Sequence, residues 1–191
     1  MATANSRRNS DALVSDLYTT PHFATAALLK REKFFGSIRD AGCGKGDISQ
    51  VLKMTGHEEI ESIDLYDWGY GKTGIDYLGM TEEADNTIIN PPFTLLNEFI
   101  MKAIETSRDK VAVFSRINAL ETVGRYEGIF KDHPPTRVYL FVNRVKCNKG
   151  GHDDGQSSAV FYCWKVWDLK DESGKTELLW IDDKNDLLPL I

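Results

Sequence analysis

The sequence predicts an α/β fold in which helices cover both faces of a mostly parallel sheet. Short apolar runs of strand composition alternate with segments whose apolar residues recur at helical spacing. Four such runs end in a polar residue: Asp40, Asp64, Asn90 and Ser115. A glycine-rich turn, residues 42–46, follows the first of them. Because parallel strands end at a common edge of a sheet, we expect these four side chains to line one edge.

The first half of the chain supplies the early strands and helices. Thr20 is expected to cap a helix with Pro21 at its first position, which continues to about Glu32. One strand is expected over residues 34–38, leading to Asp40, and another over 60–64. Between them the apolar residues fall on one face of a helix: Ile48, Val51 and Leu52. A third strand is expected to end at 87–89, directly before Asn90.

The second half continues the alternation. Helical spacing predicts a helix over residues 96–104, and a Val-Ala-Val-Phe run predicts a buried strand over 110–115. A further helix is expected over 117–130. The last two strands, 138–142 and 159–167, are expected to pair.

Length and composition fit one domain. The 191 residues are 41% hydrophobic, which is enough for a single core. We expect a flexible lead-in over residues 1–14, the domain over 15–168 and an acidic extension over 169–191. The extension packs on the domain or trails from it.

Other features limit the function classes. No apolar run has the length of a membrane span, and the polar N-terminus has no signal-peptide core. The three cysteines and four histidines show no disulfide or metal-ligand spacing. We therefore expect a cytoplasmic protein with no membrane partner and no metal.

The charge is uneven along the chain. A net charge of −6 has the wrong sign for a protein that holds a polyanion. Residues 137–152, however, contain no acid and carry four cations: Arg137, Arg144, Lys146 and Lys149. Two interpretations stand, a solvated connecting loop or a loop that touches nucleic-acid phosphates beside the active site.

The tetrad Asn90-Pro91-Pro92-Phe93 follows a strand directly. Consecutive prolines continue neither a strand nor a helix, so the chain leaves the sheet as a stiff elbow. An amide and a carbonyl then lie side by side next to an aromatic ring. This arrangement suits a planar group with an exocyclic amine, although a rigid turn is the simpler interpretation of the tetrad alone.

Three motifs together resemble class I S-adenosylmethionine-dependent methyltransferases, most closely the adenine-N6 DNA methyltransferases. They are Tyr18-Thr19-Thr20-Pro21, the loop from Asp40 to Gly46, and the tetrad. Their order resembles the gamma arrangement of that family. Residues 134–139 and 157–167 resemble its small phage-encoded members, and the likeness covers about 15–168. The resemblance implies a Rossmann-like methyltransferase fold with a seven-stranded sheet that ends in an antiparallel hairpin.

The resemblance also implies a cofactor and its site. S-adenosylmethionine would lie over the glycine loop, with Asp64 on the ribose hydroxyls and Asp76 facing the adenine amine. Asp67 is a rival for the role of Asp64, and Asp47 is interpreted only as a first-turn helix acid. The implied cofactor-binding residues are Tyr18, Thr20, Pro21, Asp40, Ala41, Gly42, Gly44, Asp64, Asp76, Tyr77 and Asn90.

For the reaction, the resemblance implies DNA as substrate, with a flipped adenine held by the tetrad. The Asn90 side-chain oxygen and the Pro91 carbonyl would accept the two N6 hydrogen bonds, and Phe93 would stack on the base. Pro92 completes the catalytic tetrad, and the reaction requires no general base with a tuned pKa. Three alternatives remain: methyl transfer to a protein glutamine amide, methyl transfer to an RNA base amine, and a non-catalytic binding module.

The chain also departs from the family. We expect no extra domain of the size that usually recognises a DNA sequence, so that any target preference would come from loops or a partner. The segment Val145-Lys146-Cys147 lacks the aromatic that relatives often use as a second stacking surface.

Overall fold

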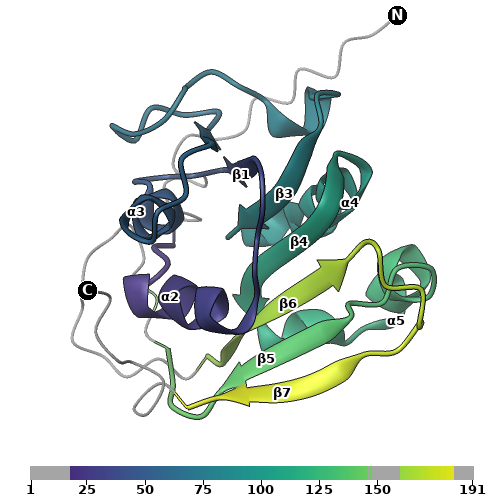
Figure 1. Ribbon diagram of the computed structural model, residues 1–191. Helices are drawn as coiled ribbons and strands as arrows, with labels where there is room; N and C mark the ends of the chain where they lie inside the picture. Colours follow the sequence, from purple (N-terminus) through teal and green to yellow (C-terminus); the bar gives the residue numbers. More distant parts are fainter. Residues whose placement is uncertain (1–17, 146, 148–159, 183–191) are drawn as a thin grey trace, which may run out of the picture.

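The computed structural model describes residues 18–145, 147 and 160–182. The expected lead-in over 1–14, Lys146, Lys149 and the end of the acidic extension lie outside the described residues. Within them, seven strands form one sheet in the order β2-β1-β3-β4-β6-β5-β7 (Figure 1). The strands are β1 (Ile38–Ala41), β2 (Ile60–Ile63), β3 (Ala84–Ile89), β4 (Ser107–Arg116), β5 (Arg137–Phe141), β6 (Tyr162–Asp168) and β7 (Glu177–Ile181).

The sheet is mostly parallel, as the sequence predicts. β2, β1, β3 and β4 pair in parallel, and β5 pairs in parallel with β7. β6 is antiparallel to both of its neighbours, β4 and β5. The expected antiparallel pair of late strands is therefore confirmed, and β6 is the single reversed strand among those described.

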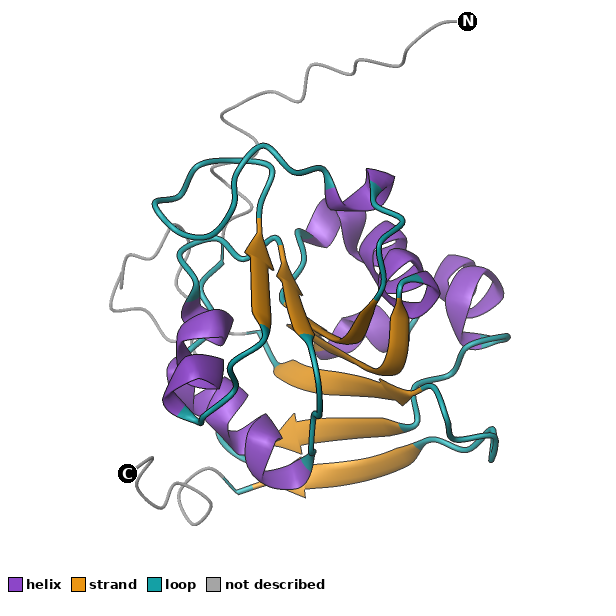
Figure 2. Cartoon of the chain, turned by 45° about the horizontal axis from the view of Figure 1, so that its top comes forward, coloured by secondary structure: helices purple, strands orange, loops and turns teal. Residues whose placement is uncertain are grey.

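Helices cover both faces, as Figures 1 and 2 show. On one face, α2 (His22–Arg31) and α3 (Asp47–Met54) pack on a core that includes Leu28, Leu52 and Trp164. On the other, α4 (Leu96–Glu105) packs on a second core around Ile100 and Trp167, with α5 (Val123–Arg125) and the π-helix η4 (Tyr126–Phe130) beside it. Three short 3-10 helices lie in the connections: η1 (Tyr77–Gly79), η2 (Phe93–Leu95) and η3 (Ile117–Leu120). None of the helices in the described ranges is both long and apolar enough to span a bilayer.

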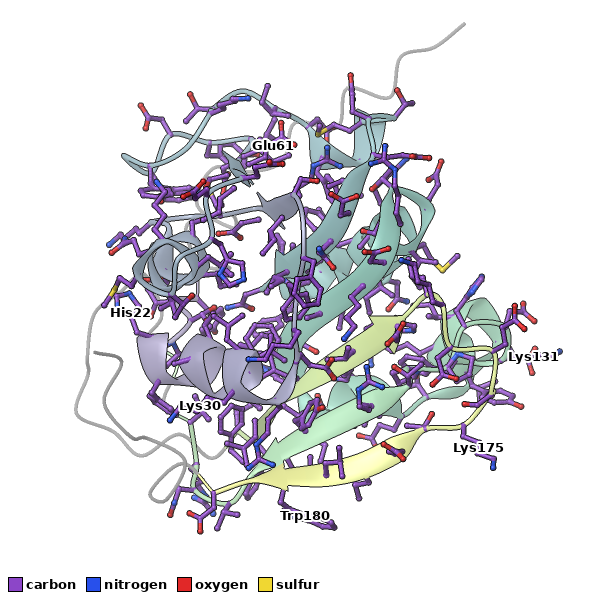
Figure 3. All side chains as sticks on the ribbon, in the orientation of Figure 1. His22, Lys30, Glu61, Lys131, Lys175 and Trp180 are labelled. Carbon is purple, nitrogen blue, oxygen red and sulfur yellow. The ribbon has the colours of Figure 1, made fainter. Side chains whose placement is uncertain are left out.

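β7 is the strand that the sequence does not predict. It lies inside the segment interpreted as an acidic extension and forms an edge of the sheet beside β5. The β5–β6 pair is therefore followed by one more strand instead of ending the sheet. Figure 3 shows Trp180 on β7 pointing away from the molecule, and its side chain is exposed.

Other boundaries differ for local reasons. The strand expected over 34–38 begins only at Ile38, because Gly36 has φ +74° and the Ser37 N–H donates to the Asp85 side chain of β3 instead of to a strand carbonyl. The helix expected over 117–130 is broken into η3, α5 and η4 at Thr122, which has φ +98°. These breaks come from tertiary contacts and backbone strain that apolar spacing does not encode.

Candidate active site

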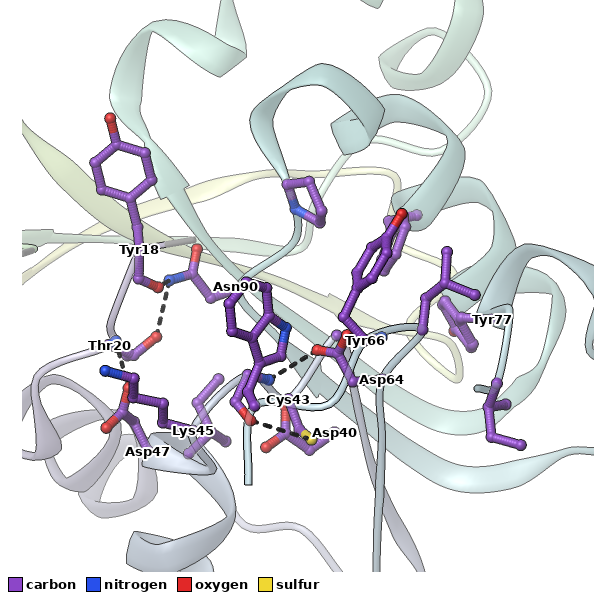
Figure 4. A pocket seen from close by; sticks show the side chains of 18 of the residues that line it. Tyr18, Thr20, Asp40, Cys43, Lys45, Asp47, Asp64, Tyr66, Tyr77 and Asn90 are labelled. Atoms are coloured by element: carbon purple, nitrogen blue, oxygen red, sulfur yellow. Dashed lines mark hydrogen bonds between the residues drawn. The ribbon is translucent and has the colours of Figure 1, made fainter. Parts of the chain in front are cut away.

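A hollow opens at the carboxyl ends of β1, β2 and β3, with about 920 Å³ of space free of protein atoms, part of it open to solvent (Figure 4). Its walls come from the glycine loop, the segment after β2, η1, the tetrad and the residues before α2. The structure brings nine of the eleven residues predicted to bind the cofactor to this hollow: Tyr18, Thr20, Asp40, Gly42, Gly44, Asp64, Asp76, Tyr77 and Asn90. Pro21 and Ala41 do not line it.

Asp64 holds the glycine loop against the end of β2. One carboxylate oxygen accepts the Gly44 N–H at 2.9 Å, and the other accepts the Tyr66 N–H at 2.9 Å. Gly42 has φ +73°, a conformation that favours glycine. Asp67, the rival of Asp64 in the sequence, is exposed and lies outside the hollow. Of the two acids, Asp64 is therefore the one in position to meet a ligand.

Asp40 is a buried acid at the wall of the hollow. Its carboxylate accepts the Ser49 hydroxyl at 2.6 Å and the Ser49 N–H at 3.2 Å. Burial raises its pKa to about 7, against these two hydrogen bonds, and the nearby charges of Asp47 and Asp64 raise it further. No cation among the described residues forms an ion pair with Asp40. A positive ligand group would therefore be favoured beside it.

The Asn90 amide is held in one orientation. Its nitrogen donates to the Tyr18 carbonyl at 3.0 Å and to the Thr20 hydroxyl at 2.9 Å, so both N–H bonds are used. The amide oxygen remains as the acceptor of this side chain. Figure 4 shows the two bonds that fix Thr20, one to Asn90 and one from its backbone N–H to Asp47.

Two expectations about this region change. Thr20 does not cap α2, because Pro21 occupies the N-cap position and the Thr20 hydroxyl is hydrogen-bonded by Asn90. Asp47 does begin α3, as expected of a first-turn acid. It also accepts the Thr20 N–H at 3.3 Å and lines the hollow. Asp47 therefore supports the segment that orients Asn90.

The rest of the tetrad divides between two environments. Pro92 lines the hollow, whereas Pro91 is buried and Phe93 is half-buried against the core and does not line the hollow. The Phe93 ring is 4.8 Å from the Tyr18 ring and 4.1 Å from the guanidinium carbon of Arg116. Tyr18 therefore contacts both the hollow and the Phe93 side of the tetrad, and joins the two regions into one site.

The predicted nucleic-acid residues are separated. Arg137 begins β5, at the opposite end of the sheet, and its guanidinium pairs with Glu32 and Asp168. Arg144 follows β5 at the same edge as the tetrad, is exposed, and lies 4.9 Å from the Phe161 ring centroid. Only Arg144 of the two described cations is thus placed to meet an acceptor.

The sequence interpretation missed several residues that line the hollow: Cys43, Lys45, Ile48, Leu65, Tyr66, Trp68, Ile75, Leu95 and Phe99. The aromatic residues directly after Asp64 were the available signal, since that loop must begin beside the strand end. The sequence gives no such signal for Phe99 and Leu95, because apolar residues at this spacing are typical of an ordinary helix core. Burial raises the pKa of the Cys43 thiol to about 12, so this side chain is a neutral packing group.

Comparison with known proteins finds similarity in structure but not in sequence families. No protein-family model matches the chain. No curated protein matches it either. Solved structures do match. A presumed RNA methyltransferase from Pyrococcus horikoshii has 17% identity and a TM-score of 0.60, over 82% of this chain and 88% of that one.

Two further solved structures are similar. The M protein of the type I restriction enzyme EcoKI has 14% identity and a TM-score of 0.59, over 85% of this chain and 48% of that one. Magnesium protoporphyrin IX methyltransferase from Synechocystis PCC 6803, with bound SAH, has 13% identity and a TM-score of 0.51, over 75% and 79%. At such identities the likeness establishes architecture alone. The chain has the Rossmann-like methyltransferase fold.

Proposed function

We propose that this chain is an S-adenosylmethionine-dependent methyltransferase that transfers a methyl group to the N6 amine of adenine in DNA. The orientation of Asn90 carries the proposal. Both of its N–H bonds are used by Tyr18 and Thr20, so its free oxygen is an acceptor beside the hollow. An acceptor in that place suits an amine substrate.

The hollow fits the proposed cofactor in its chemistry and in its place at the carboxyl ends of the parallel strands. Asp40 offers a buried carboxylate without a cationic partner, and the glycine loop lets a ligand approach the backbone. S-adenosylmethionine, when bound, supplies a methyl group on a positive sulfonium. Asp40, Gly42, Gly44 and Asp64 would hold it.

On the acceptor side, the tetrad would prepare the amine. The lone pair of an adenine N6 is delocalised into the ring, so the amine is a poor nucleophile. The Asn90 oxygen and the Pro91 carbonyl would accept its two hydrogens and draw the lone pair out of conjugation. Correct alignment of the two reacting atoms then supplies much of the rate.

Nucleic acid is favoured over a protein amide by the surroundings of the tetrad. Phe93, Tyr18 and Tyr162 form an aromatic group at this edge of the sheet. Arg144 and Phe161 form an arginine–aromatic pair on the same edge. Aromatic rings and arginines together suit stacked bases and phosphates. DNA is preferred to RNA on the resemblance of the three sequence motifs to the adenine-N6 DNA methyltransferases.

The test is transfer of label from S-adenosylmethionine to DNA, RNA and lysate protein in separate reactions. The parent should label DNA, on adenine N6. Asn90→Ala should lower transfer at least about 100-fold, because one of two acceptors that position the amine is lost. Asn118→Ala, which changes an exposed asparagine of η3, should behave like the parent.

Other outcomes separate the alternatives. Label on RNA or protein alone would replace the DNA assignment. Cofactor binding without transfer to any of the three would identify a binding module. Calorimetry should find cofactor affinity in Asn90→Ala within several-fold of the parent.

A further inference from the structure

Arg116 ends β4 beside the tetrad, on the side away from the cofactor hollow. Its guanidinium carbon is 4.1 Å from the centroid of the Phe93 ring and 5.9 Å from that of Tyr18. It is not part of the hollow. The cation therefore stands on the acceptor side of the site, in contact with the ring proposed to stack on a base.

Arg116 is a partly buried cation without an anion. No carboxylate in the described part of the chain pairs with it. Its neighbours include the Tyr162 hydroxyl, the Cys147 thiol and the two rings. Its Nε is buried and has no hydrogen-bond partner. Arg39, Arg108 and Arg137 each pair with a carboxylate. Because a buried unpaired charge costs free energy, an anionic ligand would complete this site.

The end of β4 is a rigid support for this side chain. The Arg116 carbonyl accepts a hydrogen bond from Lys165 Nζ at 3.1 Å, and the same ammonium donates to the Ser115 hydroxyl at 2.7 Å. Lys165 is fully buried in β6, which pairs with β4 along its length to Arg116. These bonds hold the backbone at the base of the Arg116 side chain, while the guanidinium itself stays able to change partners.

We propose that Arg116 binds a backbone phosphate next to the target base, which rests on the proposed function and gives it a substrate class. A guanidinium binds phosphate through two parallel N–H bonds. Arg116 now covers the Phe93 ring, so a base that stacks there from this side displaces it. The side chain then moves to the phosphate that arrives with the base. A neutral protein amide offers Arg116 no such partner.

The test compares Arg116→Gln and Arg116→Lys with Arg108→Gln, which removes an exposed arginine at the other end of β4. DNA binding is measured over a salt series, together with KM and kcat. Arg116→Gln should raise KM for DNA at least about 10-fold and lower the salt slope by about 0.9 for duplex or 0.7 for single strands. Arg116→Lys should keep the slope. Arg108→Gln should have the parent's KM and salt slope. The cofactor affinity and the melting temperature of all three variants should equal those of the parent.

A second measurement tests the phosphate itself. Once the methylated adenine is mapped, its flanking linkages are replaced one at a time by uncharged methylphosphonate. One replacement should weaken the parent about 10-fold and leave Arg116→Gln unaffected.

Specific results would overturn the inference. If a folded Arg116→Gln variant has the same KM and salt slope as the parent, Arg116 is not the phosphate contact. The same follows if the parent and Arg116→Gln lose equal affinity on methylphosphonate replacement. If the parent labels RNA with the same Arg116 dependence, the phosphate contact stands and the DNA assignment fails. If the parent transfers label only to protein, the phosphate contact and the DNA assignment both fail.

Discussion

The Asn90 amide is oriented by two oxygens that lie 72 and 70 positions earlier in the chain. Thr20→Val keeps the shape of the side chain but removes the hydroxyl that accepts one of these bonds. Loss of one such bond is worth about 0.5–1.5 kcal/mol, so we expect kcat to fall about 3–10-fold as the amide gains freedom. Thr20→Ser keeps the hydroxyl and should retain the parent kcat. Steady-state kinetics checks both, and an unchanged kcat in Thr20→Val would contradict the orienting role.

Asp40 should make cofactor binding depend on pH. Its pKa lies at about 7 because of burial, so the acid is protonated in part below neutrality. A positive ligand binds the ionised form best. Affinity should therefore fall about 10-fold from its plateau as the pH drops to one unit below the pKa. Calorimetry over this range checks the parent against Asp40→Asn, in which the contribution of Asp40 to the pH dependence is absent. Identical profiles would exclude Asp40 as the titrating group.

At the scale of elements, the turn between β1 and α3 depends on Gly46. It has φ +82°, and an added Cβ would lie 2.4 Å from the Tyr70 ring. Gly69 has φ +81° with nothing within 4 Å, so it shares the backbone cost without the contact. Gly46→Ala should lower the free energy of unfolding by about 1–3 kcal/mol more than Gly69→Ala. Urea denaturation measures both, and equal losses would show that Tyr70 moves aside without cost.

The elements also show what the sequence could predict. The strand ends near Asp40, Asp64 and Asn90 were predictable because a polar residue after an apolar run marks the sheet edge, although β1 continues past Asp40 to Ala41. β7 was not, because its five residues lie in an acid-rich stretch and only Ile181 is fully buried. Arg137 was assigned to nucleic acid from its neighbours in sequence. Its partner Glu32 lies 105 positions away, a separation that no local pattern reveals.

At the scale of the molecule, Glu32 ties the end of α2 to the sheet. This buried carboxylate accepts bonds from Lys110 on β4 and from Arg137 and Tyr139 on β5. Burial alone would raise the pKa of Glu32, but these hydrogen bonds outweigh it and hold the pKa below its ordinary value. The network therefore stabilises the fold above the unfolded pKa, and the benefit is lost as pH falls through the lower folded pKa.

Replacing this carboxylate should be costly. Glu32→Gln removes the carboxylate that the partly buried Lys110 and Arg137 share and leaves them only Asp168, so it should lower the free energy of unfolding by about 3 kcal/mol at neutral pH. Glu83→Gln, which breaks an exposed pair with Arg108, should cost no more than about 1 kcal/mol. Denaturant unfolding at pH 7 and pH 3 checks this. The difference in free energy of unfolding between the parent and Glu32→Gln should be smaller at pH 3 than at pH 7. An equal difference at both pH values would contradict the stabilising role of the ionised Glu32.

The position of β6 between β4 and β5 has a consequence for synthesis of the chain. β5 is made before β6 and β7, its two neighbours in the sheet. On the ribosome it therefore emerges with no strand to pair with, while β4 keeps an open edge. The 40 positions from Phe141 to Ile181 take roughly 2–8 s to translate at about 5–20 residues per second. During that interval both strands expose backbone groups that other chains can pair with, and this is when a nascent chain most needs a chaperone.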